Sequence, residues 1–346
     1  MKRLKRNALG VLLATAILIP GFASAVAAEE ESFFRGKTVR INVGYAAGGG
    51  FDTYSRAIAR HLAKFIPGQP TIVVENVPGA GGLIVANQLY KVAKPDGLSI
   101  GHFIGSLLMG QVLGQKGIEF DARKFEYVAA PVRAYSTCVF TKASGITTLE
   151  QWMAAKTPPK LGGVATGATV PDNMVRVLKT LGLPAQLVTG YKGTADIRLA
   201  AESGELAGSC WGWTSIKSTW RKAIDAGEVS IVLQGSPTPY PDLPAVPLVI
   251  NLARTDEARR LVQAAIHDDA VTVYQWALPP GTPRDRVQTL RKAFLDTLRD
   301  PEFLAEAQKA RLDIDPVGGE EIEKVVASLF KLEPGLVARL KETLLQ

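Results

Sequence analysis

Strand-like and helix-like patterns alternate along the first third of the chain, and this order restricts the fold more than any other feature. Strands are expected at residues 38–45, 71–75 and 98–104, and helices at residues 52–66 and 83–93. A βαβαβ order predicts a parallel sheet with helices on both faces. Ligands of such open sheets bind at the carboxyl ends of the strands, so the loops that follow these strands are the first candidates for a site.

A glycine-rich loop joins the first strand to the first helix. Gly48, Gly49 and Gly50 follow the alternating run that ends at Tyr45, and Asp52 stands where the helix N-cap is expected. Glycine lets the backbone approach a ligand closely, and a first helical turn offers unpaired N–H groups and partial positive charge. The loop therefore predicts a site for a carboxylate or phosphate. Because it lacks the spacing of nucleotide-binding loops, a plain strand-to-helix turn is the competing interpretation.

A second series of strand and helix patterns begins near residue 137. A Pro-rich segment, residues 237–247, closes this series, and the rest of the chain is helical in pattern. We expect residues 34–130 and 246–346 to form a first, discontinuous α/β lobe, and residues 131–245 to form a second. Two such lobes make a clamp with a cleft between them. The strand-like runs of the second series are residues 137–140, 161–165, 186–189, 205–210 and 229–233.

Residues 1–28 have the pattern of a secretory signal peptide. Four basic residues precede an apolar run over residues 8–19, and small residues follow it. A retained membrane anchor is the alternative, but the apolar run is shorter than the roughly 20 residues that span a bilayer. We expect cleavage to leave a soluble chain outside the cytoplasm that begins between Val26 and Glu29.

Charge and histidine usage argue against several classes of protein. Without the four N-terminal basic residues, 36 Lys and Arg face 33 Asp and Glu, so the net charge falls from +7 to +3. The remaining basic residues form no stripe with interleaved aromatics, so nucleic-acid binding is not expected. The histidines His61, His102 and His267 lack metal-ligand spacing, and neither a metal nor a cofactor is expected.

Both cysteines, Cys138 and Cys210, sit in short apolar, strand-like runs of the second series. We therefore expect them on neighbouring strands of the second lobe. An oxidising compartment would allow a disulfide between them. Two separate buried thiols are the favoured interpretation, because connectivity does not follow from sequence.

Several motifs follow one another along the chain: residues 45–52, the Glu-Asn-x-Pro-Gly-Ala-Gly-Gly run at 75–82, and residues 93–97, 190–194, 204–208 and 279–283. In this order they resemble the solute-binding receptors of tripartite tricarboxylate transporters, the Bug family. The resemblance implies a periplasmic, two-lobed binding protein of the type II or Venus flytrap class, each lobe a mainly parallel sheet flanked by helices. It also implies a monomeric receptor without catalytic activity, which captures a small organic carboxylate and hands it to membrane permease subunits.

The resemblance also implies which residues hold the ligand. In the family, the first loop and a strand-end loop of the other lobe grip one carboxylate, partly through ordered water. That second loop departs from the family pattern here, and two tryptophans stand where relatives often carry an acidic or amide-bearing stretch. Tryptophans in the cleft would favour an aromatic or bulky acid over citrate, although core packing is the plainer interpretation. The implied ligand-binding residues are Tyr45, Gly48, Gly49, Gly50, Asp52 and Ser106 on one lobe, and Thr166, Gly167, Thr169, Tyr191, Trp211 and Trp213 on the other.

Two other functions stay open at this point. The same fold serves as a ligand-presenting partner of a membrane sensor, which the sequence does not separate from transport. A secreted hydrolase is less favoured, because the chain has no Gly-x-Ser-x-Gly elbow and few histidines for a catalytic triad.

Overall fold

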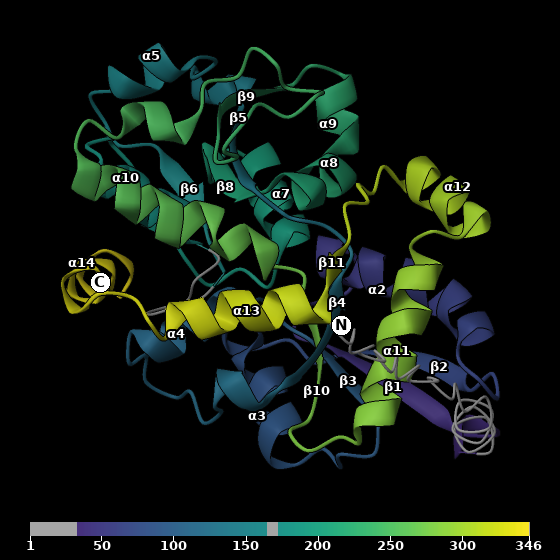
Figure 1. Cartoon of the computed structure of the whole chain (residues 1–346). Coiled ribbons are helices and arrows are strands. Elements are labelled where there is room, and N and C mark those ends of the chain that lie inside the picture. Colours follow the sequence, from purple (N-terminus) through teal and green to yellow (C-terminus); the bar gives the residue numbers. More distant parts are fainter. Residues whose placement is uncertain (1–32, 165–171, 346) are drawn as a thin grey trace, which may run out of the picture.

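Two lobes, each built on its own sheet, make up the chain (Figure 1). The computed structural model describes residues 33–164 and 172–345. The first sheet has six strands in the order β11-β4-β10-β3-β1-β2, and the second has five in the order β7-β6-β8-β5-β9. The sheet order therefore brings strands from before residue 131 and after residue 275 into one lobe.

The first sheet is mixed, with two parallel and three antiparallel strand pairings. β1 (Thr38–Val43) runs parallel to β2 (Thr71–Asn76) and β3 (Ser99–His102), as the βαβαβ pattern predicts. β10 (Trp276–Leu278) lies antiparallel between β3 and β4 (Glu126–Ala130), so β4 points the same way as β1. The short β11 (Val317–Gly318) pairs antiparallel with β4 at the edge.

Helices cover both faces of this sheet and begin directly after the strands. Their apolar faces are buried; in α11, for example, Val287, Leu290 and Phe294 are almost inaccessible to solvent. These helices are α2 (Gly50–Leu62), α3 (Leu83–Lys91), α4 (Ser106–Val112), α11 (Arg284–Thr297), α12 (Pro301–Ala310) and α13 (Gly319–Leu329).

The second sheet is also mixed, with two parallel and two antiparallel strand pairings. β6 (Lys160–Gly162) pairs parallel with β7 (Gln186–Val188) and β8 (Gly208–Gly212). β5 (Ser136–Thr141) runs antiparallel to both β8 and β9 (Val229–Gln234). Its helices are α5 (Leu149–Met153), α6 (Asn173–Thr180), α7 (Thr194–Glu202), α8 (Trp213–Thr219) and α9 (Arg221–Asp225).

Cys138 of β5 and Cys210 of β8 are direct partners in the antiparallel register and form a disulfide, with 3.9 Å between their Cα atoms. The expectation that they lie on neighbouring strands is confirmed. The favoured interpretation of two separate thiols is wrong, because the register places the two side chains on the same face of the sheet.

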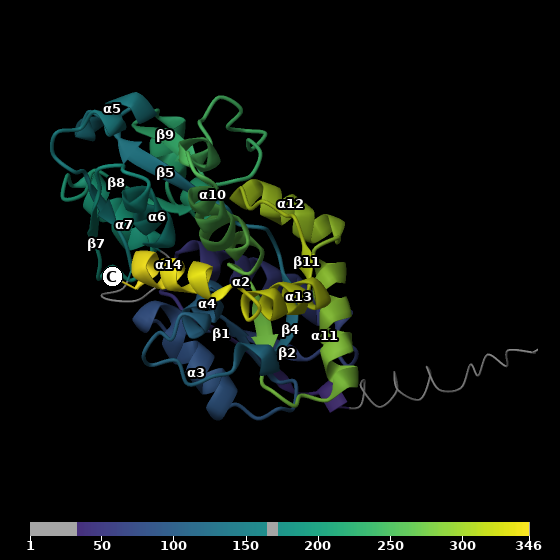
Figure 2. The same cartoon turned by 60° about the vertical axis from the view of Figure 1, so that its left-hand side comes forward.

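Helices from the C-terminal part of the chain pack against both lobes. α10 (Asp256–Val262) leads into a π-helical turn, Gln263–His267, that packs against α6, and α14 (Pro334–Leu344) packs against both α6 and α10. Figures 1 and 2 both place α14 beside the second lobe, although α13 lies against the first. We expected residues 246–346 in the first lobe, but α10, the π-helical turn after it and α14 pack on the second. The exact lobe boundaries stay a prediction.

Within residues 33–164 and 172–345, no helix combines the length and apolar character that a membrane span requires. The expected signal peptide lies outside the described residues.

Candidate functional site

The first glycine-rich loop connects β1 to α2 at the carboxyl edge of the sheet. The expected N-cap role of Asp52 is wrong: Gly49 is the N-cap, and Asp52 is the third residue of the helix. Its Oδ2 accepts a hydrogen bond from the Gly48 N–H at 2.9 Å, and its Oδ1 accepts one from Arg56 Nε at 2.9 Å. Burial opposes ionisation of Asp52, but these bonds outweigh it and lower its pKa below the ordinary value.

The hydrogen bond from the Gly48 N–H to Asp52 determines which backbone groups of the loop are open to a ligand. Asp52 already occupies the Gly48 N–H, and Gly48 has φ of +82°, a conformation that favours glycine. The N–H groups of Gly49 and Gly50 have no acceptor within the described part of the chain. These two groups are therefore the better candidates for binding an anion.

A second glycine-rich loop follows β2 and is braced against the first. Asn76 Nδ2 donates to the Tyr45 carbonyl at 3.0 Å, and Arg56 Nη2 donates to Asn76 Oδ1 at 2.8 Å. A Cβ on Gly44 would lie 2.8 Å from the Gly82 Cα, so the two loops touch backbone to backbone. Asn76 thus acts as a brace between the two loops.

Two cavities that share Tyr45 lie between the lobes. The larger, about 410 Å³ in volume, is the outer cleft, and the smaller, about 20 Å³, is the loop cavity. The outer cleft is lined by Gly44, Tyr45, Pro78, Gly79, Ala80 and Gly81 of the first lobe and by Val164, Gly190, Tyr191 and Lys192 of the second. The loop cavity is lined by Tyr45, Ala46, Ala47, Gly49, Gly50 and Phe51 of the first lobe and by Gly193, Thr194, Ala195, Asp196 and Trp211 of the second.

The start of α7 repeats the arrangement at the start of α2. Gly193 is the N-cap of α7, and the third helical residue is again an aspartate, Asp196. Its Oδ2 accepts a hydrogen bond from the Lys192 N–H, four residues earlier, at 3.3 Å. Each lobe therefore presents a glycine-capped helix N-terminus, anchored by an aspartate, to the same small cavity.

The other predicted site residues fall in different places. Trp211 is buried and lines the loop cavity, and Tyr191 lines the outer cleft while its hydroxyl donates to Glu205 at 2.6 Å. Trp213 is buried at the start of α8, where its Nε1 donates to Asp242. Ser106 is fully buried, and its hydroxyl has no partner among the described residues. Thr166, Gly167 and Thr169 lie outside the described residues.

Helix α8 of the second lobe packs directly against α2 of the first, so the lobes touch beside the loop cavity. A Cβ on Gly50 would lie 2.0 Å from Ser215 Oγ and 2.7 Å from the Tyr274 hydroxyl. Ser215 and Tyr274 hydrogen-bond to each other at 2.5 Å, and the Tyr274 ring stacks on Phe51 with 4.5 Å between centroids. Only glycine fits at position 50 in this arrangement.

Trp211 also lines a third cavity, of about 30 Å³, which we call the inner chamber. Its polar lining residues include Asn173 and Asp269, and sequence reasoning missed both. Burial raises the pKa of Asp269 to about 8, with a further contribution from neighbouring Asp268. For Asn173, the available signal was the Asp172-Asn173 pair at the start of the amphipathic helix α6, but helix capping explains such pairs equally well.

A buried acid, Asp172, lies beside this region and was also missed. Its Oδ1 accepts a hydrogen bond from Val164 N at 3.3 Å, and its Oδ2 has no partner among the described residues. Burial raises the pKa of Asp172 to about 7 despite the opposing charge of Arg176. Burial, together with Asp172, Tyr274 and Asp269, raises the pKa of Tyr45 well above its usual value.

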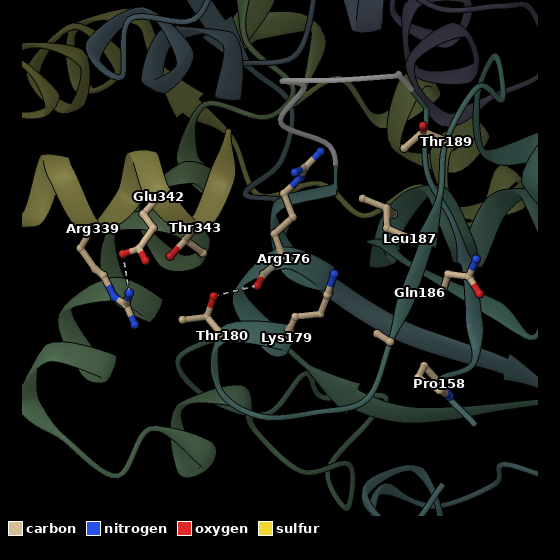
Figure 3. Close-up of a pocket in the computed structure, with 11 residues that line it drawn as sticks. Pro158, Arg176, Lys179, Thr180, Gln186, Leu187, Thr189, Arg339, Glu342 and Thr343 are labelled. Atoms are coloured by element: carbon tan, nitrogen blue, oxygen red, sulfur yellow. Dashed lines mark hydrogen bonds and ion pairs between the residues drawn. The ribbon is translucent and has the colours of Figure 1, made fainter. Parts of the chain in front are cut away.

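An open groove larger than these cavities, about 860 Å³, lies elsewhere, between α6, β7 and α14 (Figure 3). Figure 3 shows Arg339 and Glu342 of α14 paired with each other, at 2.6 Å, and Thr180 bonded to the Arg176 carbonyl. This open groove contains none of the predicted site residues.

One surface group in the described residues has the side chains of a metal site: His61, Asp300 and Glu302. Lys64 Nζ lies 2.5 Å from Asp300 and 2.9 Å from Glu302. Because this ammonium already pairs with both carboxylates, the group has a structural explanation as an ion-pair network.

Comparisons with known proteins agree with this geometry. Residues 54–328 match the family described as the tripartite tricarboxylate transporter family receptor. The chain belongs to this family of solute-binding receptors. It is 25% identical, over 96% of its length and 95% of the relative's, to "UPF0065 protein in gbd 5'region" of Cupriavidus necator.

Solved structures show the same fold. The periplasmic binding protein BugD superposes with a TM-score of 0.70 at 21% identity, covering 90% of this chain and 98% of BugD. MatC from Rhodopseudomonas palustris, solved with bound malate, superposes with a TM-score of 0.68 at 19% identity, covering 87% of this chain and 99% of MatC. The two-lobed binding-protein fold expected from the sequence is thus confirmed.

Proposed function

We propose that this receptor works in the periplasm, where it captures an organic carboxylate between its lobes and delivers it to a tripartite tricarboxylate-type permease. The ligand carboxylate binds in the loop cavity, and the rest of the ligand extends into the outer cleft. Its volume of about 410 Å³ is in the usual range for small-ligand sites.

One observation carries this proposal: the N-termini of α2 and α7, from different lobes, line the same cavity. Each offers backbone N–H groups and the positive end of a helix dipole, which favour an anion. Without an anion between them, the two positive ends repel each other. A carboxylate therefore stabilises the closed arrangement of the lobes, and Lys192 adds a cation at the rim of the outer cleft.

The fold and the buried groups favour binding over hydrolysis. Ser55 Oγ and His102 Nδ1 are hydrogen-bonded at 2.8 Å, a pair that resembles part of a catalytic triad. Both side chains are fully buried, and burial lowers the pKa of His102 to about 3. Such a pair has no access to a substrate. A sensory role uses the same ligand site, and genes for two membrane subunits beside this gene would favour transport.

Calorimetric titration with mono-, di- and tricarboxylates tests the carboxylate site. In Gly49→Val, the new Cβ lies 3.7 Å from the Ala46 carbonyl oxygen, an ordinary van der Waals contact, so we expect the fold to be retained. We expect the affinity for the best carboxylate to fall at least about tenfold, which corresponds to roughly 1.4 kcal/mol, because the branched side chain blocks the approach to the loop N–H groups.

Gly318→Val is the matched control. Gly318 is also an extended N-cap glycine with open space at its Cβ, but it caps α13, away from the cavity. Gly318→Val should bind the carboxylate as tightly as the wild type and should lose about as much stability as Gly49→Val does. The proposal fails if Gly49→Val binds as tightly as Gly318→Val, or if the best ligand of the wild type is a cation or a neutral sugar.

A further inference from the structure

The open groove between α6, β7 and α14 carries an excess of positive charge, and we call it the basic groove. Its cations are Arg176, Lys179 and Arg339, and Figure 3 shows the first two between α14 and β7. Glu342 is the only acid among the described residues that line it, and it pairs with Arg339 at 2.6 Å. Lys179 is exposed and has no ion-pair partner within the described part of the chain. The groove therefore attracts an acidic partner.

One wall of the basic groove is an edge strand. β7 stands last in the order of the second sheet, so among the described strands only β6 pairs with it. The Gln186 N–H donates to the Pro159 carbonyl at 2.9 Å, and the Val188 carbonyl accepts from the Gly163 N–H at 2.8 Å. Backbone groups alternate in direction along a strand, so the N–H and C=O of Leu187, between these two residues, point to the outer side. An extended segment of another protein can pair with such an edge.

An apolar surface adjoins the basic groove. A second open groove, of about 470 Å³, shares Thr180 and Arg339 with it. Met153, Leu181 and Leu252 line this second groove, and Met153 is 48% exposed. Methionine and arginine are enriched at protein–protein interfaces, and a mixed surface of this kind is typical of one. The size and composition of the two grooves therefore favour a protein segment over a small anion.

The basic groove lies beside the ligand cleft. Thr189 lines the groove, and the next three residues along the chain, Gly190, Tyr191 and Lys192, line the outer cleft. A segment that pairs with β7 therefore holds the strand whose end forms the rim of the cleft. This position suits the protein that receives the ligand. A second copy of the chain fits less well, because a two-fold contact through this surface would bring its cations together.

We propose that the basic groove is the docking site for an acidic, extended segment of a permease subunit. The segment adds to the second sheet as a strand beside β7, and its carboxylates pair with Lys179. This inference rests on the proposed function, because a permease receives the ligand only if the receptor serves transport.

Uptake into proteoliposomes tests the proposal. The vesicles hold the membrane subunits of the transporter, encoded in the same genome as this receptor, and the receptor is added at graded concentrations with its best carboxylate in radiolabelled form. In Lys179→Glu, the receptor concentration for half-maximal uptake should rise at least about tenfold, because a like charge now faces the acidic segment. The calorimetric affinity for the carboxylate should stay unchanged, since Lys179 lines neither the loop cavity nor the outer cleft.

Lys222→Glu is the matched control. Lys222 is also an exposed lysine in the last turn of a second-lobe helix, α9, but it lines neither groove. This variant should drive uptake at wild-type concentrations. A photo-reactive benzoylphenylalanine in place of the exposed Gln186 should cross-link to a permease subunit in the same vesicles, and one in place of Lys222 should not.

The inference is overturned if Lys179→Glu drives uptake at wild-type concentrations. It is also overturned if the photo-reactive group at Gln186 cross-links only to lipid or to a second copy of the receptor. If the wild type binds a carboxylate but drives no uptake, the proposed transport role fails, and this inference fails with it.

Discussion

Asp52 and Asp196 show how a single carboxylate shapes a binding loop in each lobe. Each stands at the third position of its helix and holds the N–H group four residues earlier. Holding that N–H fixes the bend of the loop, and the glycine N-cap then faces the cavity. Sequence reasoning found Asp52 but gave it the wrong position, because a helix start marked by glycine has no side-chain cap to locate it.

Asp269 provides a prediction at this scale. Its folded-state pKa of about 8 lies above the ordinary value of 3.8, so the folded protein keeps a proton that the unfolded chain loses. The free energy of unfolding therefore falls as pH rises from about 4 to 8. Asp269→Asn removes this pH-dependent decrease. We therefore expect the free energy of unfolding of the variant, relative to that of the wild type, to increase with pH and to gain roughly 1 kcal/mol or more by pH 8.5.

Thermal unfolding at pH 4.5, 6.5 and 8.5 measures this difference. Asp172 and Glu126 also have raised pKa values and act in the same direction, so the comparison must be between variant and wild type at each pH. A constant difference across the three pH values would contradict the prediction.

Strands and the helices between them were the most predictable elements. Alternating residues such as Val39, Ile41 and Val43 are all buried, so the period of two located β1 directly. The partners of elements were less predictable. An amphipathic pattern says that α14 has a buried face, but not that this face packs on α6 of the second lobe. The side chains of the inner chamber were hidden for the same reason, since three distant segments meet there.

The disulfide between β5 and β8 gives a prediction at the scale of elements. It closes a loop of 72 residues, for which the chain-entropy relation gives about 4 kcal/mol of stabilisation. The double variant Cys138→Ala with Cys210→Ala should lose roughly that amount. Urea unfolding of the oxidised wild type, the reduced wild type and the double variant measures it. Labelling of two free thiols in the native, oxidised protein would contradict the assignment.

The whole molecule is in a closed arrangement. Besides Ser215 and Tyr274, the lobes are joined where Lys217 forms an ion pair with Asp313, and where Arg311 pairs with Asp225. The loop cavity is small, about 20 Å³, and is lined by residues of both lobes, so a ligand carboxylate reaches it only after the lobes separate. Opening and closing is the usual motion of such two-lobed proteins.

Gly50→Ala tests this motion. Its Cβ would collide with Ser215 Oγ of α8, so the variant should hold the lobes apart. We expect the radius of gyration from small-angle scattering to decrease on ligand addition for the wild type and for Gly318→Ala, and to stay unchanged for Gly50→Ala. Equal compaction of all three proteins would show that the lobes close without this contact.

The path of the chain places its two described ends on different lobes. Phe34 is buried against the first lobe, whereas α14 carries Leu345 to the second. Lobe movement must therefore change the separation between these ends. A donor dye near residue 33 and an acceptor dye after residue 345 would turn the receptor into a fluorescent reporter of its own ligand.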